Sequence, residues 1–327
     1  MSNHALKHSL RLVKPAVAVL TCAWIVSLAD WDEVVQALPA VNAMGLAATF
    51  ALMVLSVPLS AYKWKVLLDI HGTHYPLSTL TRYYFVAMFL NNLLPSGIGG
   101  DGYRVYKTFN RSPSRSSALL AVVTERLTGL AALLLLAYVA SLVIYAQSAD
   151  PLAGAVVVAG TLMMCAMPIL VWVARRGWLL GRFYSWLGSF EIVKVILGHA
   201  GAYRRDRRRF VRVIYLSFLF HAHALLFYWL LLYSVGGSCS IFELTVAVAA
   251  MSLAAVLPVS VNGLGVMDGA FVFALVGYGV GYEYALLAVL VWRLNMILIS
   301  AAGGIVYAIG TDGRVGPKKR PGLSSET

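Results

Sequence analysis

Charged residues are scarce in this sequence. Asp, Glu, Lys and Arg together make up 12% of its 327 residues, whereas apolar residues make up 60%. Soluble domains carry roughly 25% charged residues, so the composition excludes an ordinary soluble protein. The long apolar runs that accompany this scarcity are typical of a polytopic, all-α membrane protein.

Cysteine is also rare, and the short signatures of catalysis are missing. Cys22, Cys165 and Cys239 form an odd, scattered set with neither the spacing of a metal site nor that of a redox pair. The sequence contains no nucleotide-binding loop, zinc signature or serine elbow. We therefore expect no cofactor and no bound metal, and we favour a transporter over an enzyme.

The charges are mostly positive, and their positions predict the membrane topology. The formal net charge is +12. With the N-terminus in the cytoplasm, 24 of the 26 Lys and Arg residues fall in inner stretches, whereas the outer loops near 30–42, 148–151, 236–243 and 277–283 contain none. This bias indicates a positive-inside topology, which explains the basic balance without nucleic acid. Arg126 and Arg293 lie within predicted spans instead and are candidates for function.

Six apolar runs approach the length of a membrane-spanning helix, about 20 residues. Two further runs, 78–95 and 242–258, each end at Leu-Pro and pass into a glycine-rich stretch, where a straight helix does not continue. The charge bias fits only if 78–110 enters and leaves on the inner side and 242–281 on the outer side. Both segments are therefore predicted to be re-entrant hairpins. The six predicted spans are 14–30, 43–62, 117–146, 152–174, 210–235 and 284–309.

The two predicted hairpins are similar to each other. NNLLPSGIGGDG and AAVLPVSVNGLGVMDG both contain Leu-Pro, a glycine cluster and a final Asp-Gly, and their prolines lie 163 positions apart. Each half reads helix, helix, hairpin, helix from opposite sides of the membrane, which predicts inverted-topology repeats at 1–150 and 151–312, before a basic tail at 313–327. Two unrelated proline and glycine breaks are the alternative. The residues expected to shape the hairpin backbones are Pro95, Gly97, Gly99, Gly100, Pro258, Gly263 and Gly265.

Four motifs carry a resemblance to a known family. LLPSGIGGDGYRVYK, VVTERLTGLAALLL, LPVSVNGLGVMDGAF and LVWRLN are similar to signature regions of the flippase-like integral membrane family typified by the transmembrane region of lysylphosphatidylglycerol synthetases. The resemblance spans residues 10–310 and implies movement of lipids between leaflets, or a role beside the synthesis of modified lipids and glycans. Met267 and Asp268 stand where the family often has an Arg-Glu pair. Because the sequence ends soon after position 310, we expect no aminoacyl-transferring domain in this chain.

Ionisable residues within or beside the predicted spans form the candidate site. Each costs about 2.5–3.5 kcal/mol or more near the membrane centre unless it is paired or hydrated, which indicates a hydrated cavity between the halves. We expect Arg104 and Arg293 to bind a phosphate headgroup, because a guanidinium matches phosphate in a planar fork. For Glu125 and Arg126, a structural ion pair is the alternative. The candidate substrate-binding residues are Arg104, Arg293, Asp101, Asp268, Asn262, Glu125 and Arg126.

Neighbouring asparagines and histidines are expected to have structural roles. His221 and His223 are two positions apart, so a helix points them in different directions and they do not share a metal. Four asparagines are expected to hold broken backbone together more than to select substrate. These are Asn91, Asn92, Asn262 and Asn295.

The predicted function is that of a lipid flippase that moves a phosphate-bearing lipid or lipid-linked headgroup between leaflets. The alternative is a membrane enzyme or accessory subunit of a lipid or glycan modification pathway without its own soluble catalytic domain. An amphipathic helix near 177–199 and the basic run YRRDRRRFVR predict contact with anionic lipids at the inner surface. The expected location is the bacterial cytoplasmic (inner) membrane with both termini in the cytoplasm. We expect no nucleic-acid partner, and the sequence does not indicate an oligomer.

Overall fold

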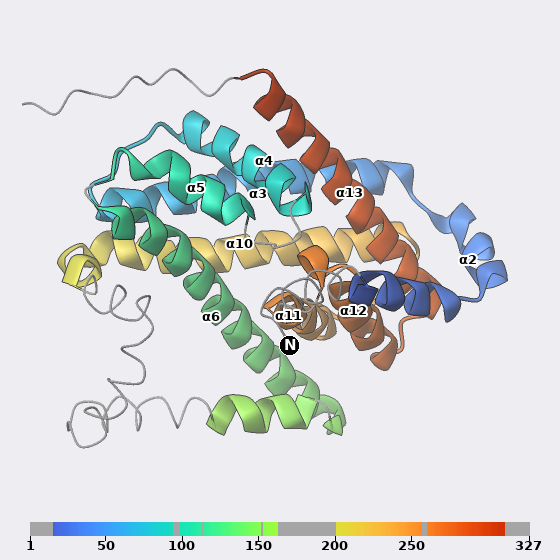
Figure 1. Ribbon diagram of the computed structural model, residues 1–327. Coiled ribbons are helices and arrows are strands. Elements are labelled where there is room, and N and C mark those ends of the chain that lie inside the picture. Colours follow the sequence, from blue (N-terminus) through green and yellow to red (C-terminus); the bar gives the residue numbers. More distant parts are fainter. Residues whose placement is uncertain are drawn as a thin grey trace, which may run out of the picture.

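The computed structural model describes residues 16–93, 99–112, 114–151, 153–162, 201–256 and 260–310, and within these residues it contains helices, turns and loops but no strand. The predicted all-α class is therefore confirmed. Pro95, Gly97, Pro258 and the predicted amphipathic helix near 177–199 lie outside the described residues. The labelled elements are α2 (Trp31–Ala37), η1 (Leu38–Ala40), α3 (Ala43–Ile70), α4 (Leu77–Leu93), α5 (Gly99–Phe109), α6 (Arg115–Ser148), α10 (Arg207–Ser234), α11 (Ile241–Val256), η2 (Val261–Gly263), α12 (Val266–Gly277) and α13 (Tyr282–Ala308) (Figure 1).

Four helices are long and apolar enough to cross a membrane, namely Ala43–Ile70, Ser116–Ser148, Arg207–Ser234 and Tyr282–Ala308. They match four of the predicted spans. The other two predicted spans contain the shorter apolar helices Ala16–Ser27 and Ala153–Leu162 among the described residues. The two Leu-Pro runs are helical up to Leu93 and Val256, and each is followed by a second short helix that packs against the first, α5 on α4 and α12 on α11.

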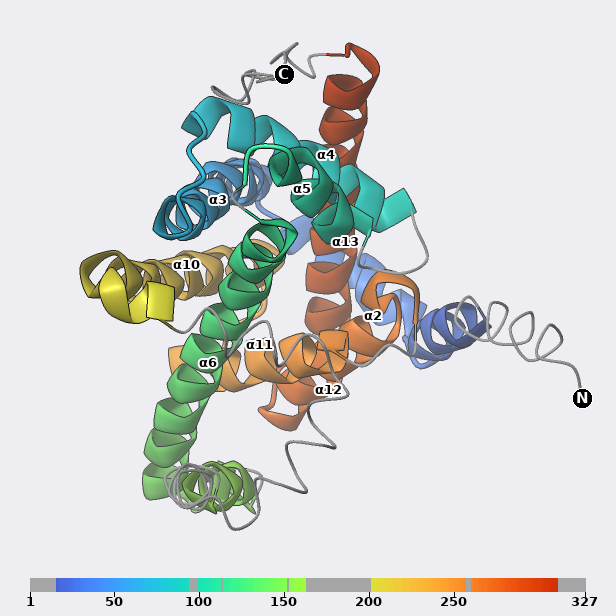
Figure 2. The same cartoon turned by 60° about the vertical axis from the view of Figure 1, so that its left-hand side comes forward.

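Helix α3 runs antiparallel to α10 along its whole length (Figures 1 and 2). Side-chain and backbone hydrogen bonds fix this register from one end to the other. They join the Asn42 N–H to the Ser234 carbonyl (2.8 Å), His223 Nε2 to the Leu52 carbonyl (2.8 Å) and His71 Nε2 to the Tyr203 hydroxyl (2.9 Å). The pair joins the two halves of the chain, since one helix belongs to each half.

Helix positions repeat between the halves. α3 and α10 are both 28 residues long and begin 164 positions apart, as do α4 and α11. After the break, α5 and α12 begin 167 positions apart, and so do α6 and α13. The packing partners are exchanged in the same way, because α4 packs on α13 and α11 packs on α6. The starts of the two short helices are thus three residues further apart in the second half, and otherwise the order of helices recurs.

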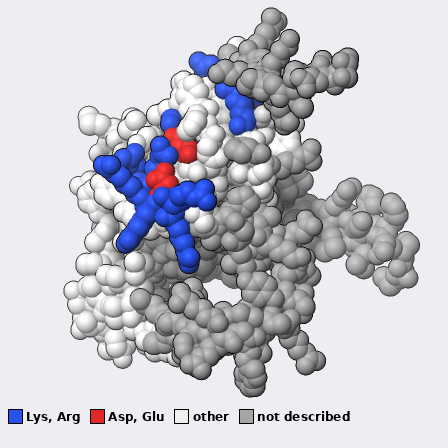
Figure 3. All heavy atoms as spheres, turned by 90° about the vertical axis from the view of Figure 1, so that its left-hand side faces the viewer, with Lys and Arg blue, Asp and Glu red and all other residues white. Residues whose placement is uncertain are grey.

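Loops that were predicted to lie on the same side meet at one end of the molecule. The Thr73 hydroxyl donates to Ser112 (3.1 Å), and the Tyr75 hydroxyl donates to the Lys107 carbonyl (3.1 Å). Burial raises the pKa of Tyr75 to about 12, so this hydroxyl keeps its proton. Lys and Arg side chains gather over this end, where α10 begins (Figure 3).

The charge count needs a correction at two positions. Lys63 was assigned to an inner loop, but α3 extends past it to Ile70 and leaves Lys63 only 5% exposed. Arg104 was also counted among the inner-loop cations, yet it lies in α5 and is 1% exposed. Both side chains are buried and contact Glu125, so neither residue indicates on which side of the membrane a loop lies.

Candidate functional site

An ion-pair cluster follows the first helix break. Asp101 lies in the first turn of α5. Arg126 of α6 donates two hydrogen bonds to its carboxylate, from Nε to Oδ2 (3.1 Å) and from Nη2 to Oδ1 (3.1 Å). Arg104, one turn further along α5, donates to Glu125 of α6 and lies 3.3 Å from Asp101 Oδ1. The structure thus joins four predicted site residues into one cluster, and it shows the ion pairing that was the alternative for Glu125 and Arg126.

Aromatic rings enclose the Arg104 guanidinium. Its central carbon lies 4.3 Å from the ring centre of Trp64 and 4.2 Å from that of Tyr84, distances typical of cation–π contacts. The Tyr84 hydroxyl donates to Glu125 Oε1 (2.8 Å), while Arg104 donates to Oε2. Both carboxylate oxygens of the buried Glu125 therefore have a hydrogen-bond partner.

A second ion pair follows the second break. Arg293 of α13 binds Asp268, in the first turn of α12, through Nε to Oδ1 (2.8 Å) and Nη2 to Oδ2 (2.9 Å). Asp268 also accepts from the Gly265 N–H (2.8 Å), and Arg293 Nη2 lies 3.4 Å from the Gly263 carbonyl oxygen. Gly263 and Gly265 have φ of 71° and 77°, a conformation that glycine adopts without strain. The pair ties α13 to the start of α12.

The two ion pairs occupy equivalent places in the two halves. Each joins the first turn of the short helix after a break to the long helix that follows, and each spans 25 positions of sequence. The pair in the first half is more exposed, since the Arg126 side chain is 61% exposed and that of Arg293 is 16% exposed.

Asparagines connect the backbone at the breaks, as expected. Asn91 Oδ1 accepts a hydrogen bond from the Gly100 N–H (2.8 Å) and so closes the first break. Asn262, whose φ is 47°, donates to Asn92 and joins the second break to the end of α4. The two breaks are therefore direct neighbours.

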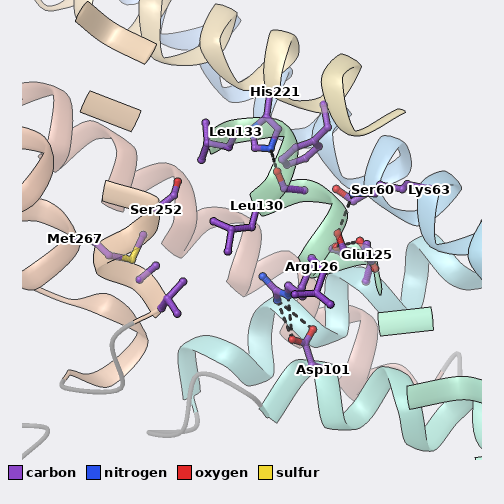
Figure 4. A pocket seen from close by; sticks show the side chains of 16 residues that line it. Ser60, Lys63, Asp101, Glu125, Arg126, Leu130, Leu133, His221, Ser252 and Met267 are labelled. Carbon is purple, nitrogen blue, oxygen red and sulfur yellow. Dashed lines mark hydrogen bonds and ion pairs between the residues drawn. The ribbon is translucent and has the colours of Figure 1, made fainter. Parts of the chain in front are cut away.

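A cavity of about 560 Å³ lies beside the first cluster and is lined by residues from both halves (Figure 4). In Figure 4 the charged side chains of Asp101, Glu125 and Arg126 lie on one side, and Met267 lies on the other. The polar lining consists of Ser60, Lys63, Tyr84, Asp101, Glu125, Arg126, Gly129, His221 and Ser252, and the apolar lining consists of Leu127, Leu130, Leu133, Phe220, Ala255, Val256 and Met267.

Some of the predicted substrate-binding residues line the cavity, whereas others form ion pairs outside its lining. Asp101, Glu125 and Arg126 line the cavity. The guanidinium groups of Arg104 and Arg293 bind carboxylates of their own halves, and neither belongs to the described cavity lining. Direct contact of these two arginines with a headgroup stays a prediction.

Sequence reasoning missed Lys63 and Tyr84 as parts of the site. Lys63 Nζ donates to the Glu125 backbone carbonyl (3.0 Å) from α3. Its one signal in the sequence is that it follows the long apolar run directly and stands beside Trp64. His221 and His223 were interpreted correctly, because they bond to different backbone carbonyls, those of Gly129 and Leu52.

Comparison with known proteins identifies the family. The family model described as the lysylphosphatidylglycerol synthase TM region matches residues 11–304, which is most of the chain. A search among curated proteins gave no match. The match covers all four motifs on which the predicted resemblance rests, as well as both ion pairs and the cavity. The chain is therefore an integral membrane protein that belongs to the lysylphosphatidylglycerol synthase transmembrane-region family.

Proposed function

We propose that the protein is a lipid flippase, which moves a phosphate-bearing lipid or lipid-linked headgroup between leaflets. One observation carries this proposal: a single cavity combines a charged end with an apolar end. A lipid has the same division between its headgroup and its chains. Charged groups at membrane depth are costly unless they are paired or line a hydrated path, and here Asp101, Glu125 and Arg126 are paired and line the cavity.

Inverted repeats supply the architecture for transport in this proposal. The recurrent helix starts, the antiparallel α3 and α10 and the exchanged packing partners support two halves of opposite orientation at 1–150 and 151–312. The helices of the two broken segments have 17 and 11 residues in the first half and 16 and 12 in the second, too short for ordinary spans and suited to re-entrant hairpins. Transporters of this kind place the substrate between the halves, where the cavity lies.

The residues at the cavity have distinct roles in the proposal. Asp101, Glu125 and Arg126 face the headgroup, while Arg104 positions Glu125 from behind. Arg293 and Asp268, with Asn262 beside them, hold the second break and give the second half a pair equivalent to Arg126 and Asp101. Rocking of one half against the other would then move the headgroup past the neighbouring breaks.

We also propose that the basic end lies in the cytoplasm of a bacterial cell, with the protein in the inner membrane. The Lys and Arg side chains over this end support both a positive-inside orientation and contact with anionic lipids (Figure 3).

A reconstitution experiment tests the flippase proposal. Purified protein is placed in phosphatidylcholine vesicles with a trace of phosphatidylglycerol that bears a fluorophore on an acyl chain, and a membrane-impermeant reductant quenches the label in the outer leaflet. We expect wild-type protein to expose the inner-leaflet label as well. Ala255→Trp, which fills the apolar side of the cavity, should slow this exchange, whereas Leu253→Trp at a 45% exposed position should not. Quenching no faster than in protein-free vesicles would favour the enzyme or accessory-subunit alternative.

A further inference from the structure

We infer that Lys63 and Arg126 form a binding site for one phosphodiester anion at the polar end of the cavity. The inference deepens the proposed function and rests on it for the lipid nature of the ligand. Lys63 comes from α3 and Arg126 from α6, and both line the same cavity.

The charges around the cavity leave one positive charge without a partner. Three cations, Lys63, Arg104 and Arg126, face two carboxylates, Asp101 and Glu125. Arg104 contacts both carboxylates and Arg126 holds Asp101 with two contacts. No carboxylate of the described residues forms an ion pair with Lys63. The cluster therefore lacks one negative charge, which a ligand with a single negative charge would supply.

Both cations line the cavity and have N–H groups available for such a ligand. The Lys63 ammonium has three N–H groups, and in the described part of the chain it makes one hydrogen bond, to the Glu125 backbone carbonyl (3.0 Å). Lys63 is 5% exposed yet lines the cavity, so its remaining N–H groups are shielded from bulk solvent. Arg126 uses Nε and Nη2 for Asp101, which leaves Nη1 without a hydrogen bond to the described residues.

Comparison of the two halves shows that the additional charges are not required by the repeated scaffold. The ion pair of Asp101 with Arg126 recurs as Asp268 with Arg293. Four other polar residues of the first half have no polar equivalent in the second half. At the equivalent positions, 164 or 167 residues later, the second half has apolar residues of the main core. Lys63, Tyr84, Arg104 and Glu125 correspond to Phe227, Val248, Phe271 and Trp292, all buried. The second half packs the same helices without these charges, which points to a ligand as the reason for them in the first half.

The chemistry of the donors favours a phosphodiester. A guanidinium offers a planar edge to two phosphate oxygens, and an ammonium adds a compact point charge. A phosphodiester carries one negative charge at neutral pH, which neutralises the cluster, whereas a phosphomonoester dianion would leave an excess negative charge. Diacyl phospholipids with an uncharged headgroup, such as phosphatidylglycerol, combine this anion with chains that match the apolar lining.

Lipid binding in detergent tests the site separately from transport. The melting temperature of purified protein is followed during titration with dioleoyl phosphatidylglycerol, with dioleoylglycerol, which lacks the phosphate, and with inorganic phosphate. We expect phosphatidylglycerol alone to raise the melting temperature at low concentration. Lys63→Gln should weaken its apparent affinity at least about tenfold, while Lys63→Arg retains most of it.

Lys65→Gln is the matched control, since Lys65 lies in the same helix but pairs with Asp69 (2.7 Å). If Lys63→Gln does not fold, Arg126→Gln carries the same expectation. Equal affinity of Lys63→Gln and wild type, or equal binding of dioleoylglycerol, would overturn the site, and saturation by inorganic phosphate would overturn its assignment to a lipid. Binding that depends on Lys63 in a protein that does not exchange lipid would overturn the proposed function and leave the site intact.

Discussion

Asn262 and Asn92, which are 170 positions apart in sequence, are joined by a side-chain hydrogen bond. Asn92 lies in the last turn of α4 and Asn262 in the short turn η2, so the bond connects the two helix breaks directly. Because the two breaks are in contact, a movement of one would displace the other. The two halves of the chain therefore meet where their helices are interrupted.

A disulfide between the breaks should stop lipid exchange. In a background without the three native cysteines, Asn92→Cys with Asn262→Cys should cross-link on mild oxidation, because the parent side chains are in contact. If the halves separate at the breaks during transport, exchange in vesicles falls on oxidation and returns with a reductant. Unchanged exchange by the fully cross-linked protein would contradict a rocking movement at this point. Each single cysteine variant serves as the control.

Two glycines of α5 should respond in opposite directions to alanine. A Cβ at Gly100 would lie 2.1 Å from the Ala87 carbonyl oxygen, which is backbone and does not rotate away, whereas a Cβ at Gly102 meets no atom within 4 Å. Gly100→Ala should lower the free energy of unfolding by about 1–3 kcal/mol. Gly102→Ala should raise it by up to about 1 kcal/mol through helix propensity. Thermal unfolding in detergent measures both, and a similar loss in each variant would mean that α4 and α5 are not packed this closely.

Removal of Arg293 should damage folding. Arg293→Ala leaves the buried Asp268 carboxylate without its partner, at an expected cost of about 3–5 kcal/mol. Arg293→Lys keeps the charge but loses the two-point contact, so its cost should be smaller. Arg209→Ala, which breaks an exposed ion pair with Asp206, should cost about 0–1 kcal/mol. A stable Arg293→Ala protein that no longer moves lipid would instead establish direct contact with the headgroup.

The buried pair of Arg104 and Glu125 should be replaceable as a unit. Arg104→Met alone leaves a buried carboxylate with one fewer donor and should cost about 3–5 kcal/mol. Arg104→Met with Glu125→Met should restore most of that stability, because apolar replacement of both partners is often neutral or better. The double variant should nevertheless fail to exchange lipid. Normal exchange by a stable double variant would remove this pair from the functional site.

Labelling of engineered cysteines checks the topology. Asn110→Cys should react with an impermeant maleimide only after the cells are opened, and Gln147→Cys should react in intact cells, because Asn110 precedes α6 and Gln147 lies in its last turn. The native thiols are replaced first. Burial raises the pKa of Cys239 to about 11, so its thiol stays protonated and reacts slowly, but it lies on the predicted outer side and would add background. Reaction of both engineered cysteines in intact cells would refute the predicted orientation.

Much of the fold follows from local sequence, whereas the site depends on packing. Apolar runs and Leu-Pro motifs predict where helices form and where they are interrupted, because both effects act within a few residues. Lys63 shows the limit of this reasoning: a lysine near the end of an apolar run is typical of a loop, and only its neighbours in α6 reveal that it is buried. The partners of Arg104 were equally hidden, since several carboxylates were available and the packing of α5 on α6 selects Glu125.

The exchange of packing partners between the halves also has a consequence for biosynthesis. α4 packs on α13, which is the last described helix to leave the ribosome, and α11 packs on α6. The first half therefore enters the membrane before the helix that covers α4 has been made, although its charged cluster is already complete, since Asp101, Arg104, Glu125 and Arg126 all belong to that half. A chain truncated after α6 would present this unfinished surface to the insertion machinery and to quality-control proteases, whereas two halves synthesised as separate polypeptides in one cell have the complementary surfaces needed to assemble.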